Sequence, residues 1–321
     1  SVSAKHKLLD KYFSSYQNKI SGEMEKFSFD SLIIDLERKA NWIIENIREN
    51  EWLENNEGYK HFNGYYDNDG ESLEGDHPLG HRMTLTGQVF PIMSGVATDE
   101  QIEEIIKSAD KYLKDDNIGG YRLNTDFKEI LLNMGRAFGF AFGHKENGAM
   151  FSHMAVMYSN ALYKRGFAEA GNEVIASIYN QSINFEESKI YPGIPEYFNN
   201  RGRGMYHYLT GSASWLLLTM VTQVYGIRGE LGDLVLAPKL LAEHFDENGK
   251  AKIKTIFAER EIVVTYENAK KLDFKDYNIK QVLLNNQEIN FNLETKKAVI
   301  SRNLITNCDK FELIKINVSL A

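Results

Sequence analysis

The chain has 321 residues, 43% of them apolar, and a formal net charge of −8 at pH 7. This length suits one large domain or two ordinary ones, and the apolar content excludes a disordered chain. The acidic balance argues against broad nucleic-acid binding, which needs clustered Lys and Arg. A single cysteine, Cys308, excludes an internal disulfide and a Cys-rich zinc site.

The N-terminal part of the chain predicts helices. Apolar residues over 32–47 follow a spacing of about 3.6 residues, with charged residues between them. Thr98 and Gln101 match a capping box, and apolar residues over 102–113 then form one helix face. Further helices are expected over 148–165, 167–182 and 212–225.

After Pro238 the chain changes to short alternating runs that are typical of strands. Asn285-Asn286 is a plausible hairpin turn. Helices therefore precede strands, which favours two domains over α/β alternation. The longest strongly apolar stretch, Trp215 to Val221, is far shorter than a membrane span, so a cytoplasmic location without membrane contact is expected. The expected strands lie at 252–257, 262–266, 279–284 and 311–318.

The first segment whose residues could take part in binding or catalysis, residues 62–78, is acidic and rich in glycine and aromatics. An EF-hand with Gly70 at its sixth position would begin at Tyr65 and end at Asp76, and neither residue fits that role. One interpretation is a polar turn. The other is a sugar-site loop, because aromatic rings stack on sugar faces and carboxylates accept hydrogen bonds from hydroxyls.

The second segment, residues 143–153, places Lys145, Glu146 and an asparagine beside glycines at the expected start of a helix. Glu146 and His153 are seven positions apart, so they would share a face on one continuous helix. The plain interpretation is a capped helix with one satisfied histidine. The cluster of unlike polar groups favours a binding or active site instead.

The third segment, residues 206–215, has small and hydroxyl residues directly before an apolar helix. The exposed N–H groups and positive dipole at a helix start can bind an anion. Thr-Gly-Ser at 210–212 is also an ordinary helix cap, but with the nearby His207 it suggests phosphate. The sequence contains no glycine-rich nucleotide loop, nucleophile elbow or HExxH pair, and no metal site is expected.

In this order, the three segments resemble the inverting phosphorylases of the cellobiose phosphorylase family, glycoside hydrolase family 94. The matching stretches are HKENGAMFSH, YHYLTGSASWLLLTMVTQVYGIRGELGDLVLAPKL and, more loosely, YYDNDGESLEGDHPLGHRMTLTGQVFPIMSG. The resemblance implies a mainly α chain with a β C-terminal domain. Residues 1–235 would be the later helices of an (α/α)6 barrel, and residues 236–321 a small β-sandwich or jelly-roll-like domain.

The resemblance also implies roles for individual residues. His153, Thr210 and Gly211 would bind phosphate, while Lys145 and Glu146 would lie near the sugar at the cleavage site. The segment 195–198 stands where some relatives have a glutamine that helps bind phosphate. The implied reaction is phosphorolysis of β-linked gluco-oligosaccharides to α-glucose 1-phosphate with inversion. No cofactor is expected, because inorganic phosphate is the co-substrate.

The general acid of the family is an aspartate in a motif like Asp-Trp-Asn-Asp, and this chain has no such motif. In relatives the motif lies upstream of the matching region. Asp67 and Asp69 are the nearby substitutes, although their loop corresponds to a later, non-catalytic segment. The catalytic acid is therefore expected upstream or on a partner chain that carries the N-terminal half of the barrel, and the isolated chain is expected to be inactive.

The resemblance also implies a possible homodimer. Two alternatives remain: a non-catalytic carbohydrate- or phosphate-binding subunit, and an inverting glycoside hydrolase on the same barrel. The hydrolase would need a catalytic base near the anomeric carbon, since it must activate water. The sequence offers no clear candidate for that base.

Overall fold

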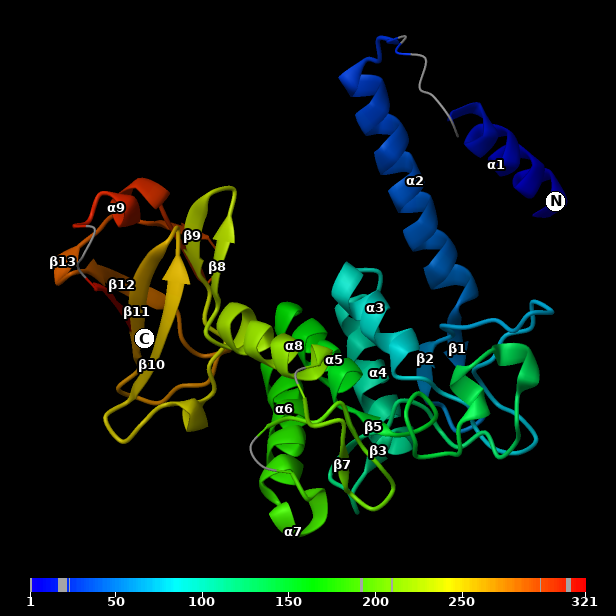
Figure 1. Ribbon diagram of the computed structural model, residues 1–321. Coiled ribbons are helices and arrows are strands. Elements are labelled where there is room, and N and C mark those ends of the chain that lie inside the picture. The colour runs from blue at the N-terminus through cyan, green and yellow to red at the C-terminus, as the bar shows by residue number, and fades with distance from the viewer. Residues whose placement is uncertain are drawn as a thin grey trace. The chain divides into compact units, whose positions relative to one another are not determined.

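A computed structural model describes residues 2–16, 22, 24–190, 193–208, 210–294, 296–309 and 313–321. The chain forms two units, residues 1–46 and 47–321. The first unit holds α1 (Val2–Tyr16) and most of α2 (Phe29–Asn50), which are blue in Figure 1. All other helices and strands described below belong to the second unit.

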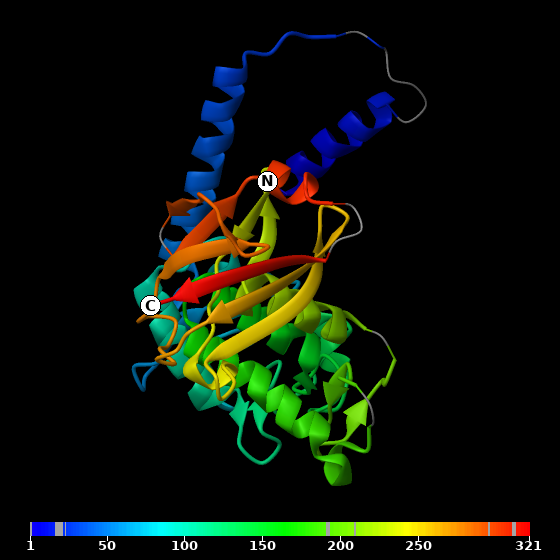
Figure 2. The same ribbon diagram turned by 90° about the vertical axis from the view of Figure 1, so that its left-hand side faces the viewer.

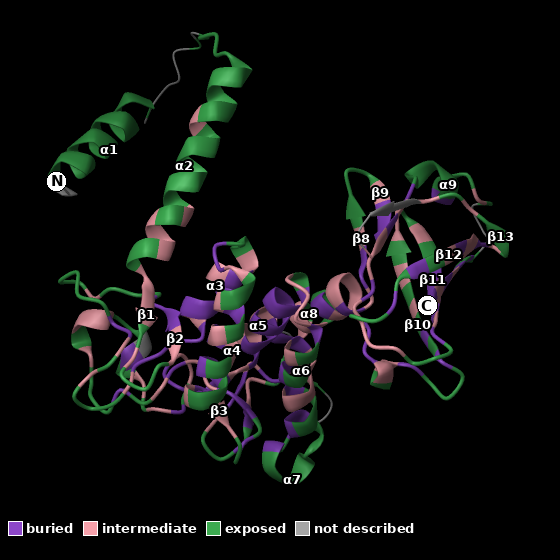
Figure 3. Cartoon of the chain, turned by 180° about the vertical axis from the view of Figure 1, so that it is seen from behind, coloured by how far each residue is buried: buried purple, intermediate pink, exposed green. Residues whose placement is uncertain are grey.

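Helix α2 confirms the helix that was predicted over residues 32–47. Asp30 in its first turn and Arg48 in its last turn complement the helix dipole. The predicted apolar face is not buried, because no residue of α2 is buried and Leu36 and Ile43 are 56% and 49% exposed. Figure 3 shows α2 green along most of its length. The spacing therefore predicted the helix correctly, but the described residues leave its apolar stripe uncovered.

The helical part of the second unit centres on α5, which packs against α3, α6 and α8 (Figure 1). Figure 3 shows α5 as mostly buried. Short turns join α3 to α4 and α5 to α6, whereas long loops lead into α3, α5 and α8. These helix pairs fit the expected barrel helices, and the closed (α/α)6 ring stays a prediction. The helices are α3 (Thr86–Ser94), α4 (Asp99–Tyr112), α5 (Ser152–Lys164), α6 (Ala168–Ile183), α7 (Phe185–Ser188) and α8 (Gly211–Thr219), which continues as a π-helical turn over Met220–Val224.

The capping box at the start of α4 is confirmed. The Thr98 hydroxyl accepts the Gln101 backbone N–H at 3.2 Å, and Gln101 Oε1 accepts the Thr98 N–H at 3.0 Å. Two of the N–H groups that a helix start leaves unpaired are thereby satisfied.

We expect Thr98→Ala to lower the free energy of unfolding by about 1 kcal/mol, because the cap acceptor is lost. Urea unfolding followed by circular dichroism measures this change. Thr98→Ser keeps the hydroxyl and serves as the control, so equal stability of the two variants would contradict the assignment of the cap.

Short strands order the loops between the helices. Strands β1 (Trp52–Glu54) and β2 (Lys60–Phe62) form one antiparallel pair, and β3 (Lys114–Asp115) and β4 (Gly120–Tyr121) form another. A third sheet joins β5 (Met150–Phe151), β6 (Tyr197–Phe198) and β7 (Gly204–Met205). This third sheet connects the second candidate segment to residues 195–198, because β5 pairs with β6.

The C-terminal part contains a five-stranded and a four-stranded sheet. Figure 2 looks toward this part, with β16 in red. The pairing of β11 with β16 is parallel, and the other pairs with described register are antiparallel. The five-stranded order is β10 (Lys250–Phe257), β11 (Arg260–Glu267), β16 (Ile314–Leu320), β12 (Ile279–Leu284) and β13 (Gln287–Glu288). The four-stranded order is β14 (Asn292–Glu294), β15 (Lys297–Ile300), β9 (Asp233–Leu236) and β8 (Ile227–Glu230), and the short helix α9 covers Arg302–Thr306.

These strands confirm the predicted β-rich C-terminal part. Buried residues of both sheets form one hydrophobic core, which also includes Tyr163, Ala168 and Val224 from the helical part. Asn285 and Asn286 have φ values of 48° and 67°, as the predicted two-residue hairpin turn requires.

The ends of the predicted C-terminal domain are less fully described. Residues 311 and 312 of the last predicted strand lie outside the described residues. The division between 1–235 and 236–321 stays a prediction, as does the jelly-roll likeness, and β9 runs across that boundary. Among the described residues, no helix combines the length and the apolar character that a membrane crossing requires.

Candidate functional site

A cavity of about 270 Å³ lies where the first two candidate segments meet. Most of its lining is apolar, as is usual for a small-molecule site with a few orienting polar groups. A larger cavity of about 620 Å³ shares Tyr65 and Thr86 with it. The smaller cavity is the candidate site because it contains the polar residues that the sequence singled out. Its lining includes Tyr65, Thr86, Asn124, Phe138, Glu146 and His153.

Glu146 lies in a tight turn rather than in a helix. His144 and Asn147 pair across the turn, and Lys145 has a positive φ of 48°. Helix α5 begins only at Ser152, so the helix expected from residue 148 starts later. The positive φ of Gly148 is the physical reason, because it is incompatible with a right-handed helix. Glu146 and His153 therefore meet at the cavity without sharing a helix.

Two polar atoms of the cavity residues lack partners. Within the described residues, Glu146 Oε2 and His153 Nε2 are buried and have no hydrogen-bond partner. Leaving such an atom unpaired costs about 1–3 kcal/mol, so buried polar atoms are normally satisfied. Both residues line the same cavity, which indicates that a polar ligand would complete them.

The predicted phosphate-binding residues come together at the starts of two helices. His153 is the second residue of α5, and Gly211 is the first residue of α8. The His153 ring packs on the Gly211 backbone so closely that a Cβ on Gly211 would lie 2.5 Å from Cε1 of the ring. Thr210 caps α8, since its hydroxyl accepts the Ser212 N–H at 3.3 Å. Adjoining positive helix ends favour an anion.

Glu196 joins these two helix starts through its backbone. Its carbonyl accepts the Ser152 N–H at 2.9 Å and the Ser212 hydroxyl at 3.4 Å. Burial lowers the pKa of His153, and the Glu196 carboxylate opposes that shift. The His153 ring is therefore neutral at pH 7, with one nitrogen able to donate and one able to accept. The sequence placed segment 195–198 near phosphate without assigning a role to any of its residues.

Lys145 lies beside Glu146 but is not among the residues that line the 270 Å³ cavity. Its Nζ lies 4.8 Å from the centre of the Tyr206 ring and 5.6 Å from that of Phe140. A hydrogen bond with Tyr206 raises the pKa of Lys145, so the side chain is positively charged. The guanidinium of Arg136 is 3.7 Å from Glu146 Oε1.

Sequence reasoning missed Arg122, whose side chain binds the backbone at the end of the Glu146 turn. Its guanidinium donates to the Gly148 carbonyl at 2.7 Å and to Asn200 Oδ1 at 2.8 Å. It also forms an ion pair with Asp115. A single arginine outside any motif gives no signal in the sequence, because its partners come from distant segments.

Asp67 and Asp69, the weak candidates for the general acid, lie in a polar turn. The Asp67 carboxylate accepts the N–H groups of Asp69 and Glu71 at 2.9 Å and the Asn133 amide at 2.8 Å. Neither aspartate is among the residues that line the two cavities. The geometry therefore adds no support for either as the acid, although Tyr65 of the same loop reaches the site. Within the described residues, no cluster of three or more His, Cys, Asp or Glu side chains is placed to hold a metal ion.

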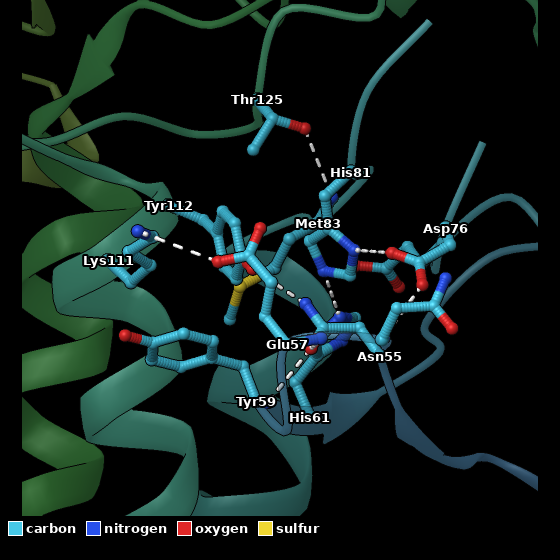
Figure 4. A network of polar contacts seen from close by, with 12 residues as sticks. Asn55, Glu57, Tyr59, His61, Asp76, His81, Met83, Lys111, Tyr112 and Thr125 are labelled. Carbon is cyan, nitrogen blue, oxygen red and sulfur yellow. Dashed lines mark hydrogen bonds and ion pairs between the residues drawn. The ribbon is translucent and has the colours of Figure 1, made fainter. Parts of the chain in front are cut away.

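A pair of histidines, His61 and His81, contacts Asp76 near the end of the same loop (Figure 4). His61 Nε2 and His81 Nε2 are 2.8 Å apart, while His61 Nδ1 is 3.0 Å from the Phe62 carbonyl and His81 Nδ1 is 3.0 Å from Asp76 Oδ1. Carbonyl and carboxylate oxygens only accept hydrogen bonds, so the Nδ1 atom of each histidine carries a hydrogen. A hydrogen bond between the two Nε2 atoms requires a further hydrogen on one of them. Burial lowers the pKa of His61 to about 4, which opposes uptake of a second proton.

The comparisons with known proteins point to one family of enzymes. The model of the "Glycosyl hydrolase 94 superfamily, catalytic domain" matches residues 29–226. A cellobionic acid phosphorylase of Neurospora crassa is 25% identical over 173 residues, which are 50% of this chain and 22% of that enzyme. A 3-O-β-D-glucopyranosyl-β-D-glucuronide phosphorylase of Paenibacillus borealis is 23% identical over 188 residues, 56% of this chain and 24% of that enzyme.

Among solved structures, a family GH92 α-mannosidase from Bacteroides thetaiotaomicron in complex with mannoimidazole is 11% identical. The match covers 82% of this chain and 30% of the mannosidase chain, with a TM-score of 0.31, which is too low to indicate a shared fold. The chain spans about a quarter of the length of the two curated relatives. Because the family model covers more than half of the chain, this protein belongs to the glycosyl hydrolase 94 superfamily.

Proposed function

We propose that this chain supplies the phosphate site and part of the sugar site of an inverting phosphorylase for β-linked gluco-oligosaccharides. One observation carries the proposal: Glu146 Oε2 and His153 Nε2 are buried, lack partners among the described residues and belong to one cavity. Glu146 suits a sugar hydroxyl, and His153 at the two helix starts suits phosphate.

The proposed chemistry needs few protein groups. An inverting hydrolase requires an acid and a base that activates water. A phosphorylase replaces water with phosphate, which is already nucleophilic, so the protein needs only the acid and a means to orient phosphate. Orientation of reactants supplies much of the rate enhancement. His153, Thr210 and Gly211 perform this orientation in our proposal, and α-glucose 1-phosphate is the product.

A second candidate substrate class is a disaccharide with a carboxylate on its acceptor sugar. The names of both curated relatives contain an acidic sugar, a cellobionic acid and a glucuronide. In this chain the Arg136 side chain is 73% exposed beside Glu146, and the charged Lys145 is its neighbour in the turn. Two cations beside Glu146 would attract a carboxylate.

The proposed reaction also requires residues beyond this chain. The motif of the family's general acid is absent from the sequence, and the chain spans about a quarter of its relatives. The uncovered apolar stripe of α2 suits helices that complete the barrel. We therefore propose a partner chain or an upstream segment that brings these helices and the acid. Homodimer formation is an additional proposal taken from the family.

Product analysis tests this function. We incubate the chain with inorganic phosphate and β-linked glucose disaccharides, including cellobiose and cellobionic acid, alone and with the polypeptide encoded upstream. Glucose 1-phosphate is expected only from the mixture, because the chain alone lacks the acid. Glucose release without phosphate would favour the hydrolase instead. Binding without any product from the mixture would favour the non-catalytic subunit.

A further inference from the structure

Glu74 is a buried carboxylate that the proposed reaction does not use. Glu74 is only 6% exposed, although it lies in a loop between two exposed stretches. Among the described residues, the largest influences on its pKa are burial, hydrogen bonds from Gly64 and Thr84, and the negative Glu51, and none of these is a cation. Burying a charge without a counter-ion is unfavourable, so its hydrogen bonds must compensate.

Each oxygen of Glu74 binds a different segment of the backbone. Oε2 accepts the Gly64 N–H, and Oε1 accepts the Thr84 N–H. The two segments touch beside this carboxylate, where a Cβ on Gly64 would lie 2.4 Å from Gly87 Cα. A carboxylate is the side chain that offers two acceptors in one plane, which suits it to join two N–H groups.

Both bound segments are walls of the 270 Å³ cavity. Gly64 directly precedes Tyr65, and Thr84 and Thr86 line the cavity themselves. Thr84 also pairs with Asn124, whose side chain bonds to Asn147 at 3.1 Å and to the Gly148 N–H at 2.8 Å. Asn147 follows Glu146 in the chain. The hydrogen bond from Thr84 to Glu74, the strand pairing of Thr84 and the side-chain bonds of Asn124 therefore link Glu74 to the turn that holds Glu146.

From this geometry we propose that Glu74 is a positioning residue: it holds the Tyr65 wall of the sugar cavity against the Thr84 wall. Its effect on sugar affinity rests on the proposed function, whereas its effect on the two backbone segments does not. Glu74→Gln keeps the shape but offers one acceptor, and the amide NH2 then faces a backbone N–H. One of the two joined segments must therefore separate.

The test uses the full chain. At pH 8, where the Glu74 carboxylate is ionised, we expect Glu74→Gln to speed hydrogen exchange of the Gly64 or Thr84 amide at least about tenfold, because one protecting bond is lost. We also expect glucose or cellobiose to bind several times more weakly, while inorganic phosphate binds as in the wild type. Glu71→Gln, an exposed residue in the same loop, is the matched control and should change neither property.

Unchanged exchange at both amides in Glu74→Gln would overturn the proposal, and so would an equal loss of phosphate and sugar affinity. If the wild type binds neither ligand, the proposed function fails, but the exchange measurement still decides the role of Glu74. If Glu74→Gln does not fold, the wild type provides the test. The amide shifts of Gly64 and Thr84 should then titrate together near pH 7, and no such titration would contradict the proposal.

Discussion

Between pH 4.5 and 6.5, the free energy of unfolding of Glu74→Gln is expected to increase with pH relative to that of the wild type. That of His61→Gln is expected to decrease with pH relative to the wild type. Burial raises the pKa of Glu74 from 4.5 to about 7 in the folded protein. Its contribution to stability is therefore present below pH 4.5 and is lost as pH rises toward 7. Burial lowers the pKa of His61 from 6.5 to about 4, so its contribution is present above pH 6.5 and is lost as pH falls.

The two contributions oppose each other within this window, since the folded protein keeps a proton on Glu74 and lacks one on His61. Each corresponds to one proton, or about 3 kcal/mol over two pH units. When either residue is replaced by neutral glutamine, the pH dependence of the free energy of unfolding reports the contribution of the other residue. Urea unfolding at pH 4.5, 5.5, 6.5 and 7.5 measures both slopes, with Glu71→Gln as the control. Parallel curves for the wild type and both variants would contradict the two shifts.

Gly211→Ala is expected to weaken the binding of inorganic phosphate at least about tenfold, because the new methyl group displaces the His153 ring. A Cβ at Gly211 would lie 2.5 Å from Cε1 of that ring, a distance that requires movement. His153→Ala should produce a similar loss, and Thr210→Ala a smaller one through the cap of α8. Calorimetric titration with phosphate measures all three affinities.

The matched control is Gly139→Ala, where a Cβ would have no atom within 4 Å and the φ angle does not favour glycine. This variant should bind phosphate like the wild type. Unchanged affinity in both His153→Ala and Thr210→Ala would refute the phosphate site. A loss in Gly211→Ala equal to that in Gly139→Ala would show that the His153 contact is unimportant.

Much of the local structure could be predicted because it depends on neighbouring residues. The capping box at Thr98 and the hairpin turn at Asn285-Asn286 require groups within a few positions of each other. The expected helix start at residue 148 was wrong, because the left-handed backbone of Gly148 cannot belong to an α-helix. Short turns of this kind are set by contacts with other segments, here the Arg122 bond to the Gly148 carbonyl.

By itself, the sequence determined the order of helices and strands, the family resemblance and the helix start that suits phosphate. Only the tertiary structure decided which distant residues meet. It packed His153 on Gly211, placed Tyr65 in the cavity with Glu146 and joined two loops through Glu74. The physical reason is that spacing along the chain encodes hydrogen bonds within an element, whereas contacts between elements depend on how their buried faces pack.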